Sequence, residues 1–467
     1  MPKIVIAAFD GLQPSQVSPE FMPVVTALAD NGVRFTHNHA VFPTVTRANS
    51  ASLVTGVTPG KHGLTANKSV FHEYSSTEVV DALIPKLPEI NKLTNGGLLF
   101  VPTLGELISK KNLMWVSVVG GTSGNAFVQH PNAAEHGDVV IHPEFTNPPE
   151  HHSIITNKFG AWPPKEAPAS ALVERTADVA IEYALSELNP DVLLVWFPEP
   201  DTSQHAYGID SAEARQMYSL ADSSLGRLLE SISKNGEDPD VFVVSDHGYS
   251  TIDSVVDVDA ELASAGFGPD QGERSVIAAE NGGSILLYLP TDNDQLAIEL
   301  VDWLDAQEWV GAIATDVPAV AKSKFASISD IGLDGPRSPD VIVAMRSVVT
   351  GQPAPLERSG AASAGVVGVG SHGGSSPAEL HNTLIVSGPS FLTGIDSQIA
   401  SGNIDVAPTV LEIFGIPVPS HMDGRTLSES LVERAAPVAP VSLNSSEPPP
   451  KIRTVTAGSA TYLCEFG

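Results

Sequence analysis

The stretch Lys3–Gly11, KIVIAAFDG, decides the fold class of this chain. From Lys3 to Phe9 the residues form a nearly continuous apolar run without the polar alternation of a half-exposed strand. The run therefore predicts a β-strand buried on both faces, as in a parallel sheet covered by helices. It stops at Asp10, and an acid at the carboxyl end of such a strand lies at the edge where open α/β sheets bind ligands. Taken alone, a strand-end aspartate is more often a turn former.

The same strand pattern recurs along the chain, separated by segments with helical spacing of apolar residues. Further buried strands are predicted, in order, at Leu113–Val119, Asp191–Phe197 and Asp240–Ser245, with shorter ones at Ser284–Leu289 and Asn382–Ser387. Helices are predicted at Met22–Asn31, Ser50–Thr55, Pro102–Lys111, Ala169–Leu188, Ser211–Ile232, near Asp294–Trp303, and at Asp405–Phe414. This alternation of strands and helices indicates an α/β protein.

Two of these later strands also lead to an acid with a histidine nearby. The strand that ends at residue 197 is followed by Asp201 and His205, four residues apart and therefore on one face of a helical turn. The strand that ends at residue 245 is followed directly by Asp246 and His247. Capping explains each acid singly, but it does not predict their repetition at one sheet edge. Carboxylate and imidazole ligands together suit Zn²⁺ or a similar transition metal.

A hydroxyl-rich run, FPTVTRANSASLVTG at Phe42–Gly56, leads into one of the predicted helices. It contains Thr44, Thr46, Ser50 and Ser52. The N-terminus of a helix leaves backbone N–H groups free to face an anion, so such a run is a good place for a nucleophile. Taken alone, such a run is far more often an ordinary N-cap. The residues alone leave open both the role and the choice between Thr44 and Thr46.

Two loops supply further polar candidates. In His62–Phe71, HGLTANKSVF, the amide of Asn67 can donate to a phosphoryl or sulfuryl oxygen, although loop asparagines usually serve turns. The glycine-rich segment GVGSHGG carries His372, which a flexible loop can bring to a metal. Its glycines spell the dinucleotide fingerprint, but no clear βαβ unit with a suitably placed acid surrounds them.

Three segments depart from the strand and helix pattern. Gly120–Pro168 is rich in His, Pro and Asn without a clear period, which predicts lid or specificity loops. Residues 253–340 are either a small inserted subdomain or a continuation of the sheet, and periodicity does not decide between them. The predicted division is one domain over residues 1–434, then a tail, 435–467, made of a Pro-rich linker and a C-terminal strand at Thr454–Phe466.

Composition limits the classes of partner. The 467 residues include 25 basic and 55 acidic side chains, a formal charge of −30, which argues against a nucleic-acid polymer or an anionic membrane as partner. A small anionic substrate then needs local positive charge, and bound metal ions are the obvious source. The single cysteine, Cys464, excludes an internal disulfide. Neither a signal-peptide pattern nor a membrane-spanning run is visible, so we expect a cytoplasmic protein.

The metal-type and hydroxyl residues occur in an order that resembles the alkaline phosphatase superfamily. The closer resemblance is to its type I phosphodiesterase / nucleotide pyrophosphatase family, which is related to phosphonoacetate hydrolase. Seven positions match in order between Lys3 and about Leu431: Asp10, Thr46, Asp201, His205, Asp246, His247 and His372. The resemblance implies a three-layer α/β/α sandwich with a mostly parallel central sheet and inserted cap loops.

The resemblance also implies a role for each matched residue. Two Zn²⁺ ions are expected, one bound by Asp201, His205 and His372, and the other by Asp10, Asp246, His247 and the hydroxyl oxygen of Thr46. Thr46 aligns with the family's nucleophile, which resolves the choice over Thr44. Asn67 aligns with the asparagine that steadies a non-bridging oxygen of the substrate. Coordination lowers the pKa of a threonine hydroxyl, so attack on phosphorus through a phospho-threonine intermediate is expected.

Two departures from the family's pattern bear on the substrate. Arg47 stands where nucleotide pyrophosphatases usually place an aromatic residue, and it either grips a second anionic group or turns into an ion pair. The carboxylate-binding lysine pair of phosphonoacetate hydrolases has no counterpart, because Lys110 and Lys111 resemble a helix end. The expected activity is a phosphodiesterase acting on a small anionic phosphorus ester. The alternatives on the same metal core are a phosphonate (C–P) hydrolase and a phosphomonoesterase.

Overall fold

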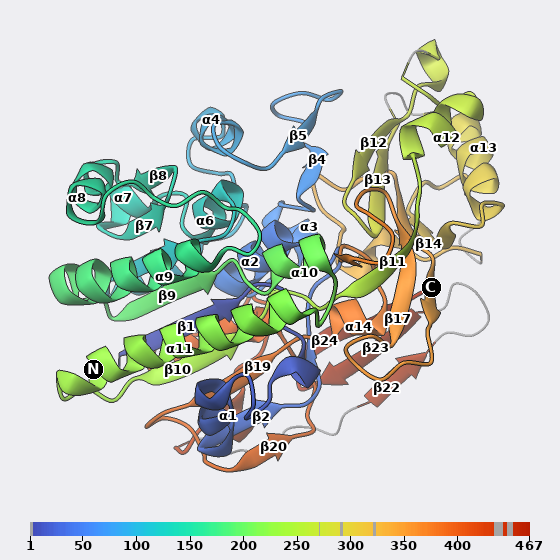
Figure 1. Ribbon diagram of the computed structural model, residues 1–467. Helices are drawn as coiled ribbons and strands as arrows, with labels where there is room; N and C mark the ends of the chain where they lie inside the picture. Colours follow the sequence, from blue (N-terminus) through green and yellow to red (C-terminus); the bar gives the residue numbers. More distant parts are fainter. Residues whose placement is uncertain (1–2, 270, 290–292, 321–323, 434–441, 446–451) are drawn as a thin grey trace.

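A nine-stranded sheet forms the centre of the computed structural model, which describes residues 3–467 except 270, 290–292, 321–323, 434–441 and 446–451 (Figure 1). Its strand order is β20-β2-β19-β10-β1-β9-β6-β7-β8. The strands are β1 (Ile4–Phe9), β2 (Gly32–Phe35), β6 (Trp115–Val119), β7 (Val139–His142), β8 (Phe145–Asn147), β9 (Val192–Phe197), β10 (Asp240–Val244), β19 (Leu384–Ser387) and β20 (Ile395–Ser397). The inner strands from β10 to β7 pair in parallel, whereas β19 and β8 run antiparallel. The predicted mostly parallel sheet is confirmed.

Strand β1 lies between β9 and β10, and its side chains alternate between two apolar cores. Val5, Ala7 and Phe9 pack in one core and the intervening residues in the other. Helices α1 (Pro23–Asp30), α9 (Ser170–Val179) and α11 (Ala212–Lys234) contribute to the first core, and Figure 1 shows α9 and α11 lying across the sheet. Helices α2 (Thr46–Thr55), α5 (Leu104–Ser109) and α15 (Val406–Ile413) contribute to the second. The three-layer α/β/α sandwich is thereby confirmed.

Residues 120–168 are largely regular structure, which corrects the prediction of loops. They form α6 (Ser123–Gln129), α7 (Ala133–His136), α8 (Glu150–Phe159) and the last two strands of the sheet, β7 and β8. Their buried histidines have protein partners: His130 Nε2 lies 2.9 Å from Asp138 Oδ2, and His142 Nε2 lies 3.2 Å from the Gly121 oxygen. The prediction failed because these elements are only 3 to 10 residues long, too short to show a clear period.

Residues 253–340 contribute to a second sheet rather than continuing the first. Its order is β12-β13-β15-β14, from β12 (Ile277–Glu280), β13 (Ser284–Tyr288), β14 (Val310–Thr315) and β15 (Val341–Met345), all antiparallel. Helices α12 (Val258–Ser264) and α13 (Asp294–Asp305) pack on one face of it. Its other face packs against Phe42, Val45 and Ala48, around the start of α2. The division of the chain into domains stays a prediction.

A third, four-stranded sheet lies beside the second one. Its order is β16-β17-β11-β18, from β11 (Ser250–Val255), β16 (Ser347–Val349), β17 (Arg358–Ala362) and β18 (Gly370–Ser371). Strand β11 continues the chain directly after the end of β10, and β18 leads into residue 372. This sheet therefore connects two of the segments that carry predicted metal ligands.

The C-terminal segment is a hairpin, whereas a single strand was predicted. Strands β23 (Ile452–Ala457) and β24 (Ala460–Phe466) pair antiparallel across a turn at Gly458, which has a φ of 60°, and β22 (Ser442–Ser445) pairs with β23. Most of the predicted Pro-rich linker lies outside the described residues. No helix in the described part of the chain is long and apolar enough to cross a membrane.

Arg337 connects the end of the 253–340 region to the loops that precede β6. Its side chain is 1% exposed, forms an ion pair with Glu73, and Nη1 donates to the Gly63 and Leu98 oxygens at 2.9 and 2.8 Å. We expect Arg337→Met to lower the free energy of unfolding by about 3 kcal/mol, because buried acceptors lose their donor. Urea denaturation measures this. Arg227→Met, which breaks an exposed ion pair with Asp178, is the control with an expected change below about 1 kcal/mol; equal losses would contradict the prediction.

Candidate active site and metal centre

The fold brings all seven predicted metal and nucleophile residues to the carboxyl edge of the central strands. They come from five chain segments: Asp10 from the end of β1, Thr46 from the start of α2, Asp201 and His205 from α10 (Asp201–Tyr207) after β9, Asp246 and His247 from the end of β10, and His372 from the turn after β18. Contacts of 3.1–3.7 Å link these seven residues into one cluster. The structure therefore brings the predicted residues together, and their role as a metal site stays a prediction.

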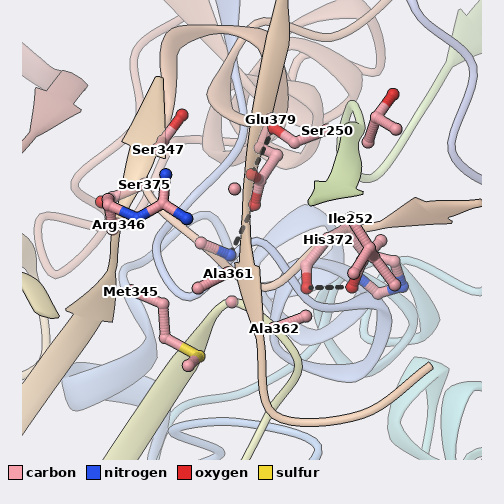
Figure 2. Close-up of a pocket in the computed structure, with 15 residues that line it drawn as sticks. Ser250, Ile252, Met345, Arg346, Ser347, Ala361, Ala362, His372, Ser375 and Glu379 are labelled. Atoms are coloured by element: carbon pink, nitrogen blue, oxygen red, sulfur yellow. Dashed lines mark hydrogen bonds between the residues drawn. The ribbon is translucent and has the colours of Figure 1, made fainter. Parts of the chain in front are cut away.

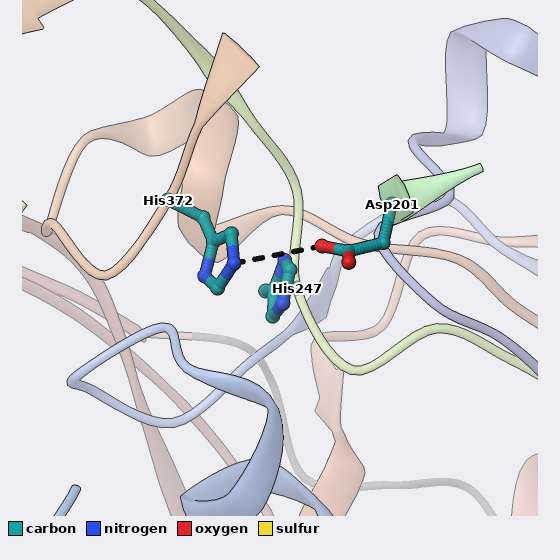
Figure 3. Close-up of side chains that lie close together, drawn as sticks. All are labelled: Asp201, His247 and His372. Atoms are coloured by element: carbon teal, nitrogen blue, oxygen red, sulfur yellow. Dashed lines mark ion pairs between the residues drawn. The ribbon is translucent and has the colours of Figure 1, made fainter. Parts of the chain in front are cut away.

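Two groups of potential metal ligands share His247. One group is Asp10, Asp246 and His247, and the other is Asp201, His247 and His372; within each, the ligand atoms lie within 4.8 Å of one another. Figure 3 shows the His247 ring beside His372, with Asp201 facing both. The two rings are stacked, with centroids 3.7 Å apart. His205 also lies close to Asp201: its Nε2 is 3.3 Å from Asp201 Oδ1. The Asp201 carboxylate of the second group therefore has His205 as a neighbour in addition to His247 and His372.

The three imidazoles are held in the tautomer that a metal site needs. In each ring Nδ1 faces a backbone carbonyl, which can only accept, so Nδ1 donates and Nε2 is the nitrogen left to bind a metal. The acceptors of His205, His247 and His372 are the oxygens of Gly370, Gly248 and Thr44, at 3.1, 3.1 and 2.8 Å. Such backbone contacts orient a ligand ring and fix which nitrogen binds the metal.

The carboxylates of Asp10 and Asp246 are each anchored by one oxygen only. Trp196 Nε1 donates to Asp10 Oδ2 at 2.9 Å, and the Gly11 N–H donates to Asp246 Oδ1 at 3.0 Å. No described residue donates a hydrogen bond to the other oxygen of either carboxylate, although both are buried. These two free oxygens lie 3.7 and 3.1 Å from His247 Nε2. Buried lone pairs facing one another call for a cation, and this donor set fits zinc.

Charge in the cluster shifts the pKa values in opposite directions. Burial, followed by repulsion from Asp246 and Asp201, holds the pKa of Asp10 well above its usual value. Burial alone would raise the pKa of Asp201, but the His205 and His372 rings bring it well below the usual value. Burial lowers the pKa of His247, yet the Asp246, Asp10 and Asp201 carboxylates outweigh it and raise the pKa to about 9. The shifts of Asp10 and His247 reflect the concentration of carboxylates, which favours a bound cation.

Thr46 is the hydroxyl that faces this cluster. Its Oγ1 lies 3.3 Å from His247 Nε2, whereas the Thr44 hydroxyl bonds to the Gly373 N–H and the Gly374 oxygen. Helix α2 begins at Thr46, four residues earlier than predicted, so Thr46 lies in its first turn. The early start was missed because all ten residues of α2 are buried, polar ones included, which hides any amphipathic period. The geometry thus favours Thr46 over Thr44 as nucleophile.

Asn67 and Arg47 lie beside the cluster on the wall of a cavity of about 310 Å³, which His205 and His372 also line. Asn67 Oδ1 accepts from the Arg47 N–H at 3.0 Å, and no described residue accepts from the Asn67 amide nitrogen, which is therefore free to donate. The Arg47 guanidinium forms an ion pair with Asp81 and donates to the backbone oxygen of Asn67 at 2.9 Å. Of the two alternatives for Arg47, the structure shows the ion pair.

Tyr249 and Trp196 support the site and were not predicted. The Tyr249 hydroxyl donates to the Asp201 carboxylate, and its ring closes over Gly11, where a Cβ would stand 2.4 Å from the ring. Gly11 has a φ of +70°, so the chain needs glycine there for both reasons. Tyr249 follows His247 by two residues and Trp196 lies within a predicted strand. The only feature of the sequence that could have pointed to these two residues is that they lie close to the ends of predicted strands.

An α/β/α sandwich with carboxylates and imidazoles gathered at its parallel strand ends defines an alkaline-phosphatase-like class of protein. The chain belongs to the type I phosphodiesterase / nucleotide pyrophosphatase family, whose family profile matches residues 4–350. Human ectonucleotide pyrophosphatase/phosphodiesterase family member 7 is 24% identical over 255 residues, 54% of this chain and 48% of that protein. Ectonucleotide pyrophosphatase/phosphodiesterase 1 of Saccharomyces cerevisiae is 25% identical over 273 residues, 54% of this chain and 34% of that protein. The chain thus spans half or less of the length of these relatives.

Solved structures agree on the fold. Human ectonucleotide pyrophosphatase / phosphodiesterase 5 superposes with a TM-score of 0.63 at 16% identity, over 92% of this chain and 100% of that one. The murine protein of the same name, as an inactive threonine-to-alanine variant in complex with AMP, also gives 0.63 at 16% identity, over 90% and 97%. At this identity the likeness shows the fold alone.

Proposed function

We propose that this protein is a di-zinc hydrolase of phosphorus esters, acting as a phosphodiesterase through a phospho-threonine intermediate at Thr46. The observation that carries the proposal is the placement of Thr46 Oγ1 3.3 Å from His247 Nε2, within a cluster of unpartnered buried carboxylate oxygens. Family membership supports phosphodiester hydrolysis as the reaction. The murine neighbour, made inactive by removal of a threonine hydroxyl and bound to AMP, supports a threonine-dependent reaction on a phosphate ester.

The residues that would hold the metal all belong to this cluster. Asp201, His205 and His372 would hold one zinc, and Asp10, Asp246 and His247 the other, with the Thr46 oxygen; this division assigns His247 to the second ion, although its ring also lies close to Asp201 and His372. When bound, zinc lowers the pKa of a coordinated hydroxyl and offsets negative charge on phosphoryl oxygens. It also supplies the positive charge that a protein of net charge −30 needs for an anionic substrate.

The chain's own residues supply positioning and attack. Thr46 Oγ1 forms a bond to phosphorus while the bond to the leaving ester oxygen breaks, and water then hydrolyses the phospho-threonine and restores the hydroxyl. Asn67, with its carbonyl oxygen fixed by the Arg47 N–H, directs its amide nitrogen to a non-bridging oxygen. Thr46 also lies in the first turn of α2, and the N-terminus of a helix favours negative charge.

A substrate panel tests this function. Zinc-loaded protein is assayed on bis-p-nitrophenyl phosphate, p-nitrophenyl phosphate and phosphonoacetate, with metal content measured on the same samples. We expect the diester to give the highest kcat/KM, because Arg47, the one arginine among the described residues that line the cavity, is paired with Asp81 and is not free to bind the second charge of a monoester dianion. A higher kcat/KM for phosphonoacetate or the monoester would replace the phosphodiesterase with one of the two alternatives. Cytoplasmic location and the absence of a nucleic-acid or membrane partner stay predictions.

The Arg47–Asp81 pair predicts how specificity would change. The Arg47 side chain is 8% exposed and Asp81 46%, so Asp81→Asn leaves a buried guanidinium without its counter-ion on the cavity wall. We expect the KM for a diester that carries a second anionic group to fall by roughly tenfold relative to a neutral methyl diester. Steady-state kinetics on the two diesters measure the ratio. Asp423→Asn, which breaks the Lys61–Asp423 pair away from this cavity, is the control, and an equal change in both variants would contradict the prediction.

A further inference from the structure

Thr44 connects the nucleophile segment to the loop that carries His372. Its hydroxyl accepts from the Gly373 N–H at 2.9 Å and lies 2.7 Å from the Gly374 oxygen, to which it donates. Its backbone oxygen accepts from His372 Nδ1 at 2.8 Å. Three hydrogen bonds thus join one buried threonine to three consecutive residues of the loop. Thr44 precedes the proposed nucleophile by two residues.

Glu379 anchors the other side of the same loop. Its Oε2 accepts from the Gly374 N–H at 2.5 Å and lies 3.2 Å from the Thr44 hydroxyl, while Oε1 accepts from the Ser250 hydroxyl at 2.6 Å. Figure 2 shows Glu379 bonded to Ser250 in a small cavity that His372 also lines. Glu379 is 5% exposed, so this carboxylate has little access to solvent. Its hydrogen bonds therefore hold the loop, through Gly374, against Ser250 at the start of β11.

The loop has little structure of its own to fix the imidazole. It follows β18, a strand of only two residues, and leads into α14 (Pro377–Leu380). Gly373 has a φ of +99°, and a Cβ on it would lie 1.9 Å from the Asn281 oxygen. The chain thus passes closely between residue 281 and Thr44. The position of the imidazole depends on these side-chain contacts rather than on a helix or a long strand.

We infer that Thr44 is a positioning residue, whose hydroxyl fixes the His372 imidazole for metal binding and holds it in register with Thr46. The role of the metal in this inference rests on the proposed function. A ligand already held in place loses less freedom when the metal binds, and partners of metal ligands typically change metal affinity by 10- to 100-fold when removed. The inference gives a role to Thr44, the threonine of the hydroxyl-rich run that is not the proposed nucleophile.

The test compares Thr44→Val with Thr44→Ser in the full chain. Valine removes both hydroxyl bonds and leaves the backbone oxygen in place, whereas serine retains the hydroxyl. Zinc affinity is measured on metal-stripped protein by competition with a chromophoric chelator. We expect Thr44→Val to weaken the affinity by about 10- to 100-fold and Thr44→Ser by less than about threefold. The kcat for bis-p-nitrophenyl phosphate should fall with the affinity at fixed zinc, and return towards the wild-type value as zinc is raised.

The control is Thr176→Val, since Thr176 is also fully buried and its hydroxyl donates to the Leu172 oxygen at 2.7 Å within α9. Wild-type zinc affinity in Thr44→Val, or an equal loss in both valine variants, would overturn the inference. If Thr44→Val does not fold, Glu379→Gln is measured instead, and an unchanged zinc affinity there overturns the inference in the same way. Should wild-type protein bind zinc but cleave no ester, the proposed function fails, whereas the valine–serine difference in affinity still decides the role of Thr44.

Discussion

Thr46→Ala is expected to lower kcat/KM by at least about a thousandfold for every phosphorus ester that the wild-type protein hydrolyses, because the attacking oxygen is lost. Only Oγ1 of this residue contacts the cluster, at 3.3 Å from His247 Nε2, and the remaining ligands do not depend on it for their anchoring bonds. The zinc content should therefore stay at about two ions per chain. Metal analysis and steady-state kinetics on the same preparation measure both quantities.

Thr46→Ser provides the matched control, because it keeps the hydroxyl and removes only a methyl group from the first turn of α2. We expect it to retain measurable turnover and to form a phospho-serine that acid quenching traps during a reaction with excess substrate. Thr46→Ala should yield no trapped phosphoprotein. Unchanged turnover in Thr46→Ala would exclude Thr46 as the nucleophile, and direct attack by water would then explain hydrolysis at the same site.

The architecture was predictable where strands are long and buried. The apolar runs before Asp10, Asp201 and Asp246 fall in three adjacent strands, and six-residue runs such as Ile4–Phe9 and Val192–Phe197 have a strong pattern because both faces of the sheet are covered. Strands β7 and β8, at one end of the sheet, have four and three residues; β7 pairs with β6, and β8 pairs only with β7. Short elements of this kind have no periodic signal, which is why residues 120–168 were predicted as loops.

The candidate site was predictable in its members but not in its geometry. Strand ends placed the acids, the glycine-rich loop suggested His372, and the family resemblance added the choice of Thr46, which chain spacing could not provide. The contacts that decide the chemistry were invisible: the Nδ1 bonds of the three histidines, the Arg47–Asp81 pair and the sharing of His247 between two groups. These contacts join residues that are distant in sequence, or they depend on how a ring is oriented. Composition and periodicity report neither property.

Asp246→Asn should separate the role of this carboxylate in stability from its role in metal binding. In the wild-type protein Asp246 Oδ1 accepts from the Gly11 N–H, and Oδ2 lies 3.1 Å from His247 Nε2. Burial lowers the pKa of His247, but the carboxylates, Asp246 first among them, raise it to about 9, so the metal-free protein at neutral pH holds a buried pair of opposite charges. An asparagine keeps the bond to Gly11 and removes this attraction, so we expect the metal-free variant to be less stable than metal-free wild type by about 1–3 kcal/mol.

With zinc the difference should widen. Zinc at about a hundred times its dissociation constant stabilises a protein that binds it by about 2.7 kcal/mol, whereas a variant that has lost a charged ligand gains much less. Thermal unfolding with chelator and with excess zinc therefore gives four values, and the difference between wild type and Asp246→Asn should be larger with zinc by about 2 kcal/mol. Asp222→Asn is the control, since both oxygens of Asp222 already accept backbone N–H groups, from Val24 and Val25, at 3.0 and 2.8 Å. It should be destabilised by the same amount in both conditions, because an amide nitrogen there would face a donor; an equal difference for Asp246→Asn in both conditions would mean that its carboxylate is not a metal ligand.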